Sequence, residues 1–482
     1  MNKRLTGTLA VMVCFSMLTA CAANPNQGAV TSKNDGVFQA NVTQQATGPV
    51  DEQVQISEVF TSTDKTAEYT VNINGTVTTG TLPVVEVVPH YITSEEVQNV
   101  ATVLFGNAEF YKRQHEAKQQ DYSKAQLQQK LDLLTPLASE EAVIELYGSL
   151  DKEVLNNVQA DIQKYTVQME SASEKNPLTP CDWNFTDESD YFEFSNGNQI
   201  IFATVTHNGV NYNIYALTRD KNDYKQNVIT VNLDYSWYEE AAVRASLCRT
   251  EKPTEDQIYA LEMKAQEMLN QMELGQWQVC GAEVTTNIVG DIAEYTITIN
   301  AAPVLHGTPV IYGQSISDLT STDANASNYQ MTSATFVFST NGDLITFGMI
   351  SPIEISKVVN ESVATRSASE LMENAKSHLS LYGVASGFGI PYDVIDGWQT
   401  HYGEPLSCKL EISEMKYGLA RVKVPDSDFH YYYIPVMVLY SSVDFYGKNT
   451  GTLYFGSEEF FDSRMQDLIW INAVDGSIIS GT

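Results

Sequence analysis

Thr335-Phe-Val-Phe-Ser-Thr-Asn-Gly-Asp-Leu-Ile345 and Leu468-Ile-Trp-Ile-Asn-Ala-Val-Asp-Gly-Ser-Ile-Ile479 are two stretches with one pattern. In each, an apolar run leads into a polar turn with a glycine, Gly342 or Gly476, and a second apolar run follows. Glycine suits such turns because it adopts positive φ without steric cost. Each stretch therefore predicts a hairpin that closes an antiparallel sheet.

A helix with a capping box precedes each hairpin. Thr254 is followed by Gln257, and Ser367 by Glu370, ahead of apolar residues at helical spacing. A strand entering through Pro-Val, at Pro309 or Pro435, is expected between helix and hairpin. We predict two related helix-plus-sheet units, a first repeat over residues 254–355 and a second repeat over residues 365–482.

The remaining chain divides into further segments. Alternating strands predict a small β region over residues 51–92, with a turn at Asn74-Gly75. A capping box at Thr93 and Glu96 opens a helical subdomain over residues 93–172. Strand runs separated by Asn-Gly turns predict a β-rich middle over residues 182–250. The predicted fold class is α+β, with helices packed on antiparallel sheets.

The N-terminus is built like an export signal. Lys3 and Arg4 precede a short apolar run that ends in Leu18-Thr19-Ala20-Cys21. That run is shorter than the ~20 residues that a membrane-spanning helix needs. Residues 1–20 are therefore predicted to be a signal peptide. Residues 21–50 are poor in large apolar side chains and predict a flexible tether.

The tetrapeptide that ends at Cys21 resembles the lipobox of bacterial lipoproteins. The resemblance implies that the Cys21 thiol receives a diacylglycerol and that cleavage leaves Cys21 as the first mature residue. The protein would then be anchored on the extracytoplasmic face of the cell membrane. The alternative is an ordinary signal cut after Ala20 that leaves Cys21 a plain thiol.

Two further resemblances concern the mature chain. The C-terminal segment with Tyr433-Ile434-Pro435-Val436 and the closing hairpin resembles PepSY-like modules and the extracytoplasmic regulators of sensor kinases. The segments at residues 84–89 and 104–111 are similar to an uncharacterised family of large lipoproteins from Gram-positive gut bacteria. Neither resemblance implies catalytic residues, since the shared positions are turns, strands and helix caps. Both are compatible with a partner protein in the membrane or envelope.

The charge of the chain argues against polyanionic partners. Its 60 acidic residues face 28 basic ones, a formal net charge of −32. Loss of residues 1–20 would remove Lys3 and Arg4 and no acid, leaving 26 basic residues and a charge of −34. Proteins that bind nucleic acid need clustered Lys and Arg to neutralise phosphates. Nucleic acid is therefore not expected as a partner.

Four cysteines would remain beside the lipidated one: Cys181, Cys248, Cys280 and Cys408. In an exported protein they could form two disulfides whose pairing the sequence does not define. Free buried thiols are the alternative, because a core of this size needs no covalent bridge. Their wide spacing disfavours a zinc site.

No catalytic, cofactor or metal motif emerges. Ser315 lacks the second glycine of a nucleophile elbow, and His115-Glu116 lacks the second histidine of a zincin. We therefore expect a non-catalytic binding or regulatory module. The alternatives are an envelope polysaccharide or peptidoglycan hydrolase with an acidic pair not yet identified, and a solute-capturing lipoprotein.

Overall fold

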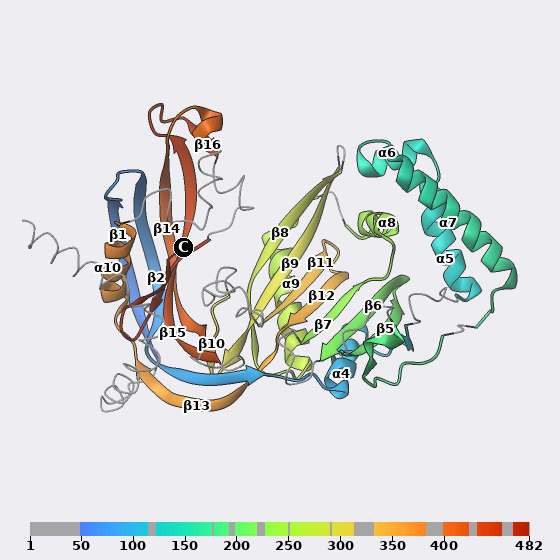
Figure 1. The fold of residues 1–482 in the computed structure, drawn as a ribbon, viewed down its shortest axis with the longest axis horizontal. Helices are drawn as coiled ribbons and strands as arrows, with labels where there is room; N and C mark the ends of the chain where they lie inside the picture. Colours follow the sequence, from blue (N-terminus) through green and yellow to red (C-terminus); the bar gives the residue numbers. More distant parts are fainter. Residues whose placement is uncertain are drawn as a thin grey trace, which may run out of the picture. The chain divides into compact units, whose positions relative to one another are not determined.

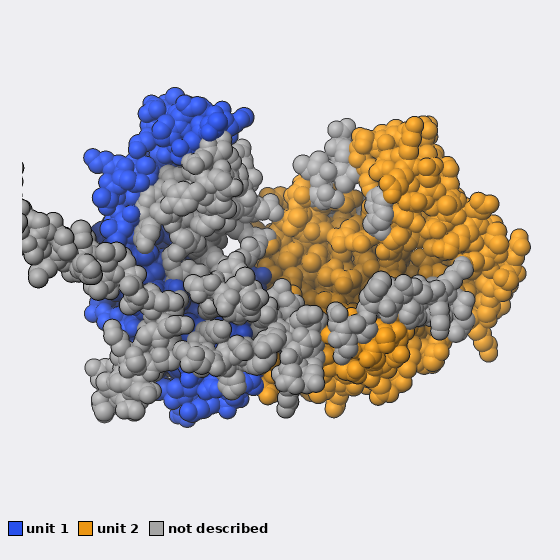
Figure 2. All heavy atoms as spheres, in the orientation of Figure 1, with its two compact units in different colours: residues 1–88, 306–327, 355–482 blue, residues 89–305, 328–354 orange. Residues whose placement is uncertain are grey.

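The computed structural model confirms an α+β fold with antiparallel sheets and packed helices (Figure 1). The structure describes residues 49–113, 122–175, 178–191, 198–218, 227–248, 251–289, 292–312, 332–381, 399–423, 431–455 and 466–481. These residues form two compact units, coloured separately in Figure 2. Unit 1 comprises residues 1–88, 306–327 and 355–482, and unit 2 comprises residues 89–305 and 328–354.

Unit 1 is built on an eight-stranded sheet with the strand order β1-β2-β14-β15-β17-β18. Strand β13 also pairs with β2, and β16 with β15. Helix α10 packs on this sheet, where its apolar side chains join a core with side chains of β1, β2, β14, β15 and β17. The elements are β1 (Pro49–Thr61), β2 (Ala67–Pro89), β13 (Ile353–Ala364), α10 (Ala368–Leu379), β14 (Leu406–Lys423), β15 (Tyr431–Gly447), β16 (Leu453–Phe455), β17 (Gln466–Asn472) and β18 (Ile478–Gly481). The short strand β10 (Thr308–Pro309) lies among the residues of unit 1 but is not part of this sheet.

The N-terminal strands are part of this sheet and do not form a separate small β region. Residues 408–412 of β14 pair in parallel with residues 67–71 of β2. The turn expected at Asn74-Gly75 is absent from the described structure, because β2 runs through both residues and Gly75 pairs with Val54 of β1. The chain reverses instead before β2, where the Ser62 hydroxyl accepts a hydrogen bond from the amide of Ala67.

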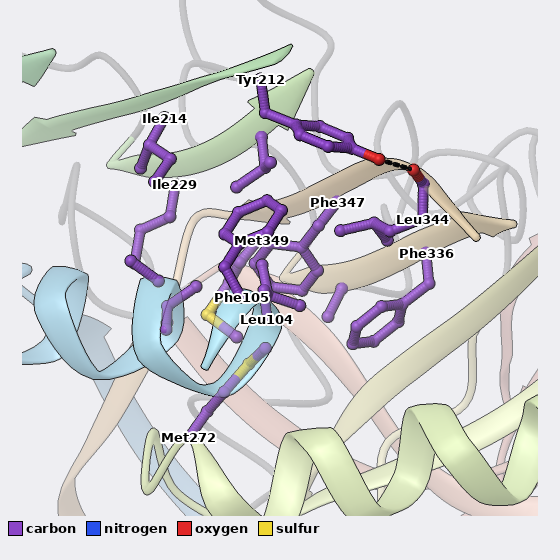
Figure 3. Packing of buried hydrophobic residues seen from close by; sticks show 14 of the residues in the cluster. Leu104, Phe105, Tyr212, Ile214, Ile229, Met272, Phe336, Leu344, Phe347 and Met349 are labelled. Carbon is purple, nitrogen blue, oxygen red and sulfur yellow. Dashed lines mark hydrogen bonds between the residues drawn. The ribbon is translucent and has the colours of Figure 1, made fainter. Parts of the chain in front are cut away.

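Unit 2 is built on a second sheet, with β9-β11-β12-β7-β6-β5-β3 in order, β8 beside β9 and β4 beside β5. Helices α4 and α9 contribute to its main core together with these strands (Figure 3). The elements are α4 (Ser94–Phe105), β3 (Phe110–Lys112), β4 (Thr186–Asp187), β5 (Gln199–His207), β6 (Val210–Thr218), β7 (Val228–Leu233), α9 (Glu255–Gln271), β8 (Trp277–Val289), β9 (Ile292–Leu305), β11 (Ser333–Ser339) and β12 (Leu344–Ile350).

The core of unit 2 is aromatic at its centre. Phe336 and Phe347 are fully buried, with ring centroids 4.8 Å apart. The Tyr212 hydroxyl donates to the carbonyl of Leu344 at 2.7 Å, which gives this buried polar group a partner (Figure 3). The capping box predicted at Thr93 and Glu96 is present and starts α4.

A second cluster in unit 2 consists of four helices: α5 (Lys124–Leu134), α6 (Glu140–Tyr147), α7 (Lys152–Ser171) and α8 (Trp237–Leu247). The predicted helical subdomain therefore differs from the observed one at both ends. Helix α4 packs on the sheet, and α8 joins from the segment expected to be β-rich. The sequence carried a signal for α8, because Ser236 and Glu239 form its capping box.

The two predicted repeats share one architecture. We call the elements α9, β8, β9, β11 and β12 the α9 module, and α10, β14, β15, β17 and β18 the α10 module. Each is a helix followed by four antiparallel strands that pair in chain order. The hairpin glycines, Gly342 and Gly476, both have the positive φ expected of them, 85° and 79°.

The helices match residue by residue. The buried residues of α9 are Leu261, Ala265 and Leu269, and those of α10 include Leu371, Ala375 and Leu379, so both follow the pattern Leu-x-x-x-Ala-x-x-x-Leu. One position before each alanine, a side chain donates to the carbonyl of the hairpin glycine. Lys264 Nζ lies 2.8 Å from the Gly342 oxygen, and Asn374 Nδ2 lies 3.2 Å from the Gly476 oxygen.

The strands match in register as well. The last strand residue before the turn is Ser339 in the α9 module and Asn472 in the α10 module. Ser339 pairs with Thr296, which pairs with Thr285 on its other side. In the same way, Asn472 pairs with Val436, which pairs with Gly418. The first strand of each module has a bulge five positions before Thr285 or Gly418, since the pairing skips one residue there in both. A bulge at the same place in both modules is a shared structural feature.

The expected Pro-Val correspondence does not hold in this alignment. Val436 corresponds to Thr296, whereas Val310 lies in unit 1 and bridges Leu419 of β14. The Ile311 amide also donates to the Leu419 carbonyl at 2.9 Å. Gly418 permits this approach, because an added Cβ there would lie 2.7 Å from the Ile311 side chain and 2.8 Å from the Pro309 oxygen.

Candidate functional site

The predicted site residues fall into different parts of the chain. Cys21 lies outside the described residues, so its lipidation stays a prediction. The structure forms no disulfide among the four cysteines that it describes, Cys181, Cys248, Cys280 and Cys408. Cys408 belongs to the core of unit 1, and the other three belong to unit 2.

Two of these thiols are buried and unsuited to act as nucleophiles. Burial raises the pKa of Cys248 to about 11, and it raises the pKa of Cys408 well above the usual range. A thiol reacts as its thiolate, so a raised pKa lowers its reactivity at neutral pH. Cys280 is exposed, and it is the residue that the bulge of β8 leaves out of the pairing.

Lys130 on α5 is a buried charged residue of unit 2. Its side chain is 5% exposed and its ammonium lies 3.4 Å from Glu239 Oε1, whose side chain is 2% exposed. Three tyrosine rings, those of Tyr122, Tyr165 and Tyr235, surround the ammonium at 5.3, 5.5 and 5.5 Å from their centroids. These distances allow cation–π attraction in addition to the ion pair.

This lysine–tyrosine cluster is structural. The second oxygen of Glu239 accepts from the backbone and hydroxyl of Ser236 at 2.9 and 2.8 Å, so the carboxylate both caps α8 and neutralises Lys130. The pair therefore ties α8 to α5. Sequence reasoning missed both residues, since their partners come from distant positions along the chain.

A small cavity of about 20 Å³ lies beside this cluster. A space of this size holds roughly one water molecule, whereas ligand pockets measure several hundred Å³. Its one lining carboxylate, Asp234, forms an ion pair with Arg113 and accepts from Asn213 Nδ2 at 2.9 Å. The described residues also contain no group of three or more His, Cys, Asp or Glu side chains placed to hold a metal ion.

His90 joins two carboxylates in unit 2. Its Nε2 lies 2.8 Å from Glu96 and its Nδ1 lies 3.4 Å from Glu354. The hydrogen bond to Glu96 raises the pKa of His90, against the opposing effect of burial. Glu96 is already held by the backbone and hydroxyl of Thr93 at the start of α4. This arrangement connects three segments and fits a structural anchor.

The outer side of α9 has a different character. Tyr259 and Met263 lie one helical turn apart, and they are 63% and 53% exposed. In the alignment that matches Leu261 with Leu371, the corresponding residues of α10 are exposed as well, but they are Ser369 and Glu373. The shared scaffold therefore does not require apolar side chains at these two positions.

Acidic side chains flank this apolar pair. Glu255 and Asp256 lie in the first turn of α9, and Glu262 and Glu267 lie on either side of Met263 along the helix. The one lysine of the helix, Lys264, is held at the Gly342 carbonyl. We call Tyr259 and Met263 with these four acids the α9 face. It is the candidate functional site.

At the neighbouring edge of β8, a side chain of α9 forms hydrogen bonds with part of the backbone. Gln266 donates to the Trp277 carbonyl and accepts from the Val279 amide of β8, each at 2.9 Å. The side-chain amide thus occupies two backbone groups of this strand, as a paired strand would. The bulge that follows at Cys280 further disrupts a regular edge. The helix surface is therefore a better docking site than this part of the strand.

The comparisons with known proteins add a distant structural likeness. No protein-family model matches the chain, and no curated protein matches it. Among solved structures, it is similar to the crystal structure of an uncharacterized protein from Eubacterium rectale. That likeness has a TM-score of 0.39 and 11% sequence identity, and it covers 92% of this chain and 97% of that one. Among the described residues, none of the helices is long and apolar enough to span a membrane.

Proposed function

We propose that this protein is a lipid-anchored extracytoplasmic protein that acts as a non-catalytic binding or regulatory module. Cys21 would hold it at the outer face of the cell membrane, and a membrane or envelope protein would be its partner. The sequence that ends at Cys21 supports the anchor. The α9 face supports the binding role.

The observation that carries the proposal is the difference between two equivalent helix surfaces. Single exposed apolar side chains are common on folded proteins, whereas neighbouring ones that form a patch can mark a surface that contacts a partner. The α10 module shows that this scaffold folds with Ser369 and Glu373 at the equivalent positions. As neighbouring exposed apolar residues that the scaffold does not require, Tyr259 and Met263 support a binding role.

The hydrolase alternative has less support. Glycosidases place two carboxylates about 5–9 Å apart at a pocket that admits a sugar. The cavity of about 20 Å³ in the described part of unit 2 has one lining carboxylate, which Arg113 already neutralises.

The proposal is tested by crosslinking and affinity purification from native membranes, comparing the wild-type chain with Cys21→Ala. The expected result is one enriched membrane or envelope protein, together with fatty-acid labelling of the wild-type chain. Both should be lost in Cys21→Ala. Cys14→Ala is the matched control, because it changes another cysteine of the same N-terminal segment and should lose neither.

Two results would contradict the proposal. Labelling that persists in Cys21→Ala would remove the lipid anchor. Recovery of no specific protein with either chain, together with release of sugars from cell-wall glycans by the purified protein, would favour the hydrolase.

A further inference from the structure

We propose that the α9 face binds a cationic amphipathic helix, with apolar anchors seated on Tyr259 and Met263 and Lys or Arg side chains against the flanking acids. This inference rests on the proposed function and names the chemistry of the partner.

The spacing of the apolar pair suits a helical partner. Tyr259 and Met263 are four residues apart, so they form one ridge along the outer side of α9. Ridges of this kind pack into the grooves between side chains of a facing helix. Tyrosine and methionine are also frequent anchors in interfaces, since the first offers a large rigid ring and the second adapts its shape.

The charge around the pair selects a basic partner. Four carboxylates flank it, those of Glu255, Asp256, Glu262 and Glu267, and Lys264 is directed at the Gly342 carbonyl. Complementary charges on a partner would speed its association and fix its orientation.

The same charge disfavours two other occupants. A second copy of the chain would bring another formal charge of −32 and an equally acidic face. An anionic membrane surface attracts basic segments and would repel this acidic one. A cationic protein segment is thus the occupant that the charges favour.

The direct probe is a synthetic peptide of about 18 residues, long enough to form a helix on binding, with leucines along one face and lysines along the other. A scrambled peptide of the same composition has the same charge without the apolar face. A third peptide with glutamates in place of lysines keeps the apolar face and reverses the charge of the polar face. Binding to the full chain is measured by fluorescence anisotropy at low and moderate salt.

Two variants separate the contributions of the α9 face. Tyr259→Ser with Met263→Gln removes the apolar pair without changing the charge, and we expect about tenfold weaker binding. Glu262→Gln with Glu267→Gln removes two acids, and we expect weaker binding with a smaller salt dependence. Val167→Ser and Glu145→Gln are matched controls on α7 and α6, since both residues are exposed elsewhere in unit 2.

Transfer of the apolar pair alone provides the converse test. Ser369→Tyr with Glu373→Met would place this pair on α10, where Thr365, Arg366, Met372 and Ser377 stand in place of the four acids. It should therefore add no second site for the cationic peptide, and a second site of equal affinity would show that the acids are not needed. The proposal is overturned if the scrambled peptide binds as tightly as the amphipathic one. It is also overturned if loss of Tyr259 and Met263 changes the affinity no more than the control variants do.

Failure of this inference is distinguishable from failure of the proposed function. If the α9 variants still enrich the same membrane protein in the crosslinking experiment, the binding role stands and the surface lies elsewhere. If the wild-type chain binds the amphipathic peptide but no partner is enriched from membranes, the surface stands and the anchored binding role fails.

Discussion

The α9 module extends its sheet beyond its last strand, whereas the α10 module extends its sheet beyond its first. In unit 2, β12 pairs with β7 and the sheet continues through β6 and β5. In unit 1, β14 pairs with β2, and β1 follows. The helix, the hairpin and the bulge are nonetheless in the same places.

This comparison separates the residues that the scaffold needs from those that it tolerates. Ala265 and Ala375 are both fully buried, where each helix packs on its sheet. Lys264 and Asn374 differ in chemistry but donate to the same carbonyl of the hairpin. On the outer side of the helices, Tyr259 and Met263 differ in chemistry from Ser369 and Glu373, and the two pairs have no shared structural role of this kind. The α9 face is therefore where the two modules have diverged in a way that packing does not explain.

The largest expected effect concerns helices α5 and α8 of unit 2, which lie outside the α9 module. Lys130→Met leaves Glu239 buried without its cation and should lower the stability of unit 2 by about 3–5 kcal/mol. Hydrogen exchange should rise across α5 and α8 and remain unchanged in β15 of unit 1. Equal destabilisation of both units would show that they do not unfold separately.

The next effect tests the equivalence of the two helices. Leu269→Ala and Leu379→Ala each remove a buried side chain at matching positions, and each should cost about 2–5 kcal/mol. Chemical denaturation followed by hydrogen exchange should place the loss in unit 2 for the first variant and in unit 1 for the second. A large effect in one module and a negligible effect in the other would break the alignment.

A smaller effect tests where the modules differ. Gly418→Thr introduces the residue found at the equivalent position of the α9 module, but it meets Ile311 and the Pro309 carbonyl and should cost about 1–3 kcal/mol. The reciprocal Thr285→Gly should cost no more than about 1 kcal/mol, because it only adds flexibility to a strand. If both variants unfold at the same denaturant concentration, residues 306–312 do not lie against β14.

The smallest effect is a difference in pH response. Hydrogen bonding to Glu96 raises the pKa of His90 in unit 2, so its contribution to stability is complete below its unfolded pKa of about 6.5 and declines above it. Burial lowers the pKa of His378 in unit 1, so that contribution is complete above about 6.5 and declines below it.

Between pH 5 and pH 8, the two units should therefore change stability in opposite directions. Hydrogen exchange corrected for its intrinsic pH dependence measures this for each unit. His90→Gln should flatten the response of unit 2, and His378→Gln that of unit 1. A common direction in both units would contradict the assigned environments.

Patterns of residues close together in the sequence predicted much of this fold. The capping boxes at Thr254 and Ser367 and the hairpin glycines Gly342 and Gly476 predicted both modules, because caps and turns depend on residues close in sequence. The pairing of β2 with β14 could not be predicted in this way, since it joins segments more than 300 residues apart. Asn74-Gly75 has a turn composition, but pairing along the whole of β1 keeps it extended.

The candidate site was only partly visible in the sequence. Helical spacing alone places Leu261, Ala265 and Leu269 on one side of α9 and leaves Tyr259 and Met263 off that side. Their significance emerged from the alignment with α10, which needed the observed burial and contacts. Lys130 and Glu239 gave no signal as a pair, because their contact depends on how α5 and α8 pack.

The central claim is that one of two equivalent helix surfaces binds a partner and the other does not. A photo-crosslinking amino acid placed at position 259 in cells should form an adduct with one membrane or envelope protein, and Met263→Gln should reduce that adduct. The same amino acid at position 369 should form none. Equal adducts at both positions, or an adduct at position 369 alone, would contradict the account.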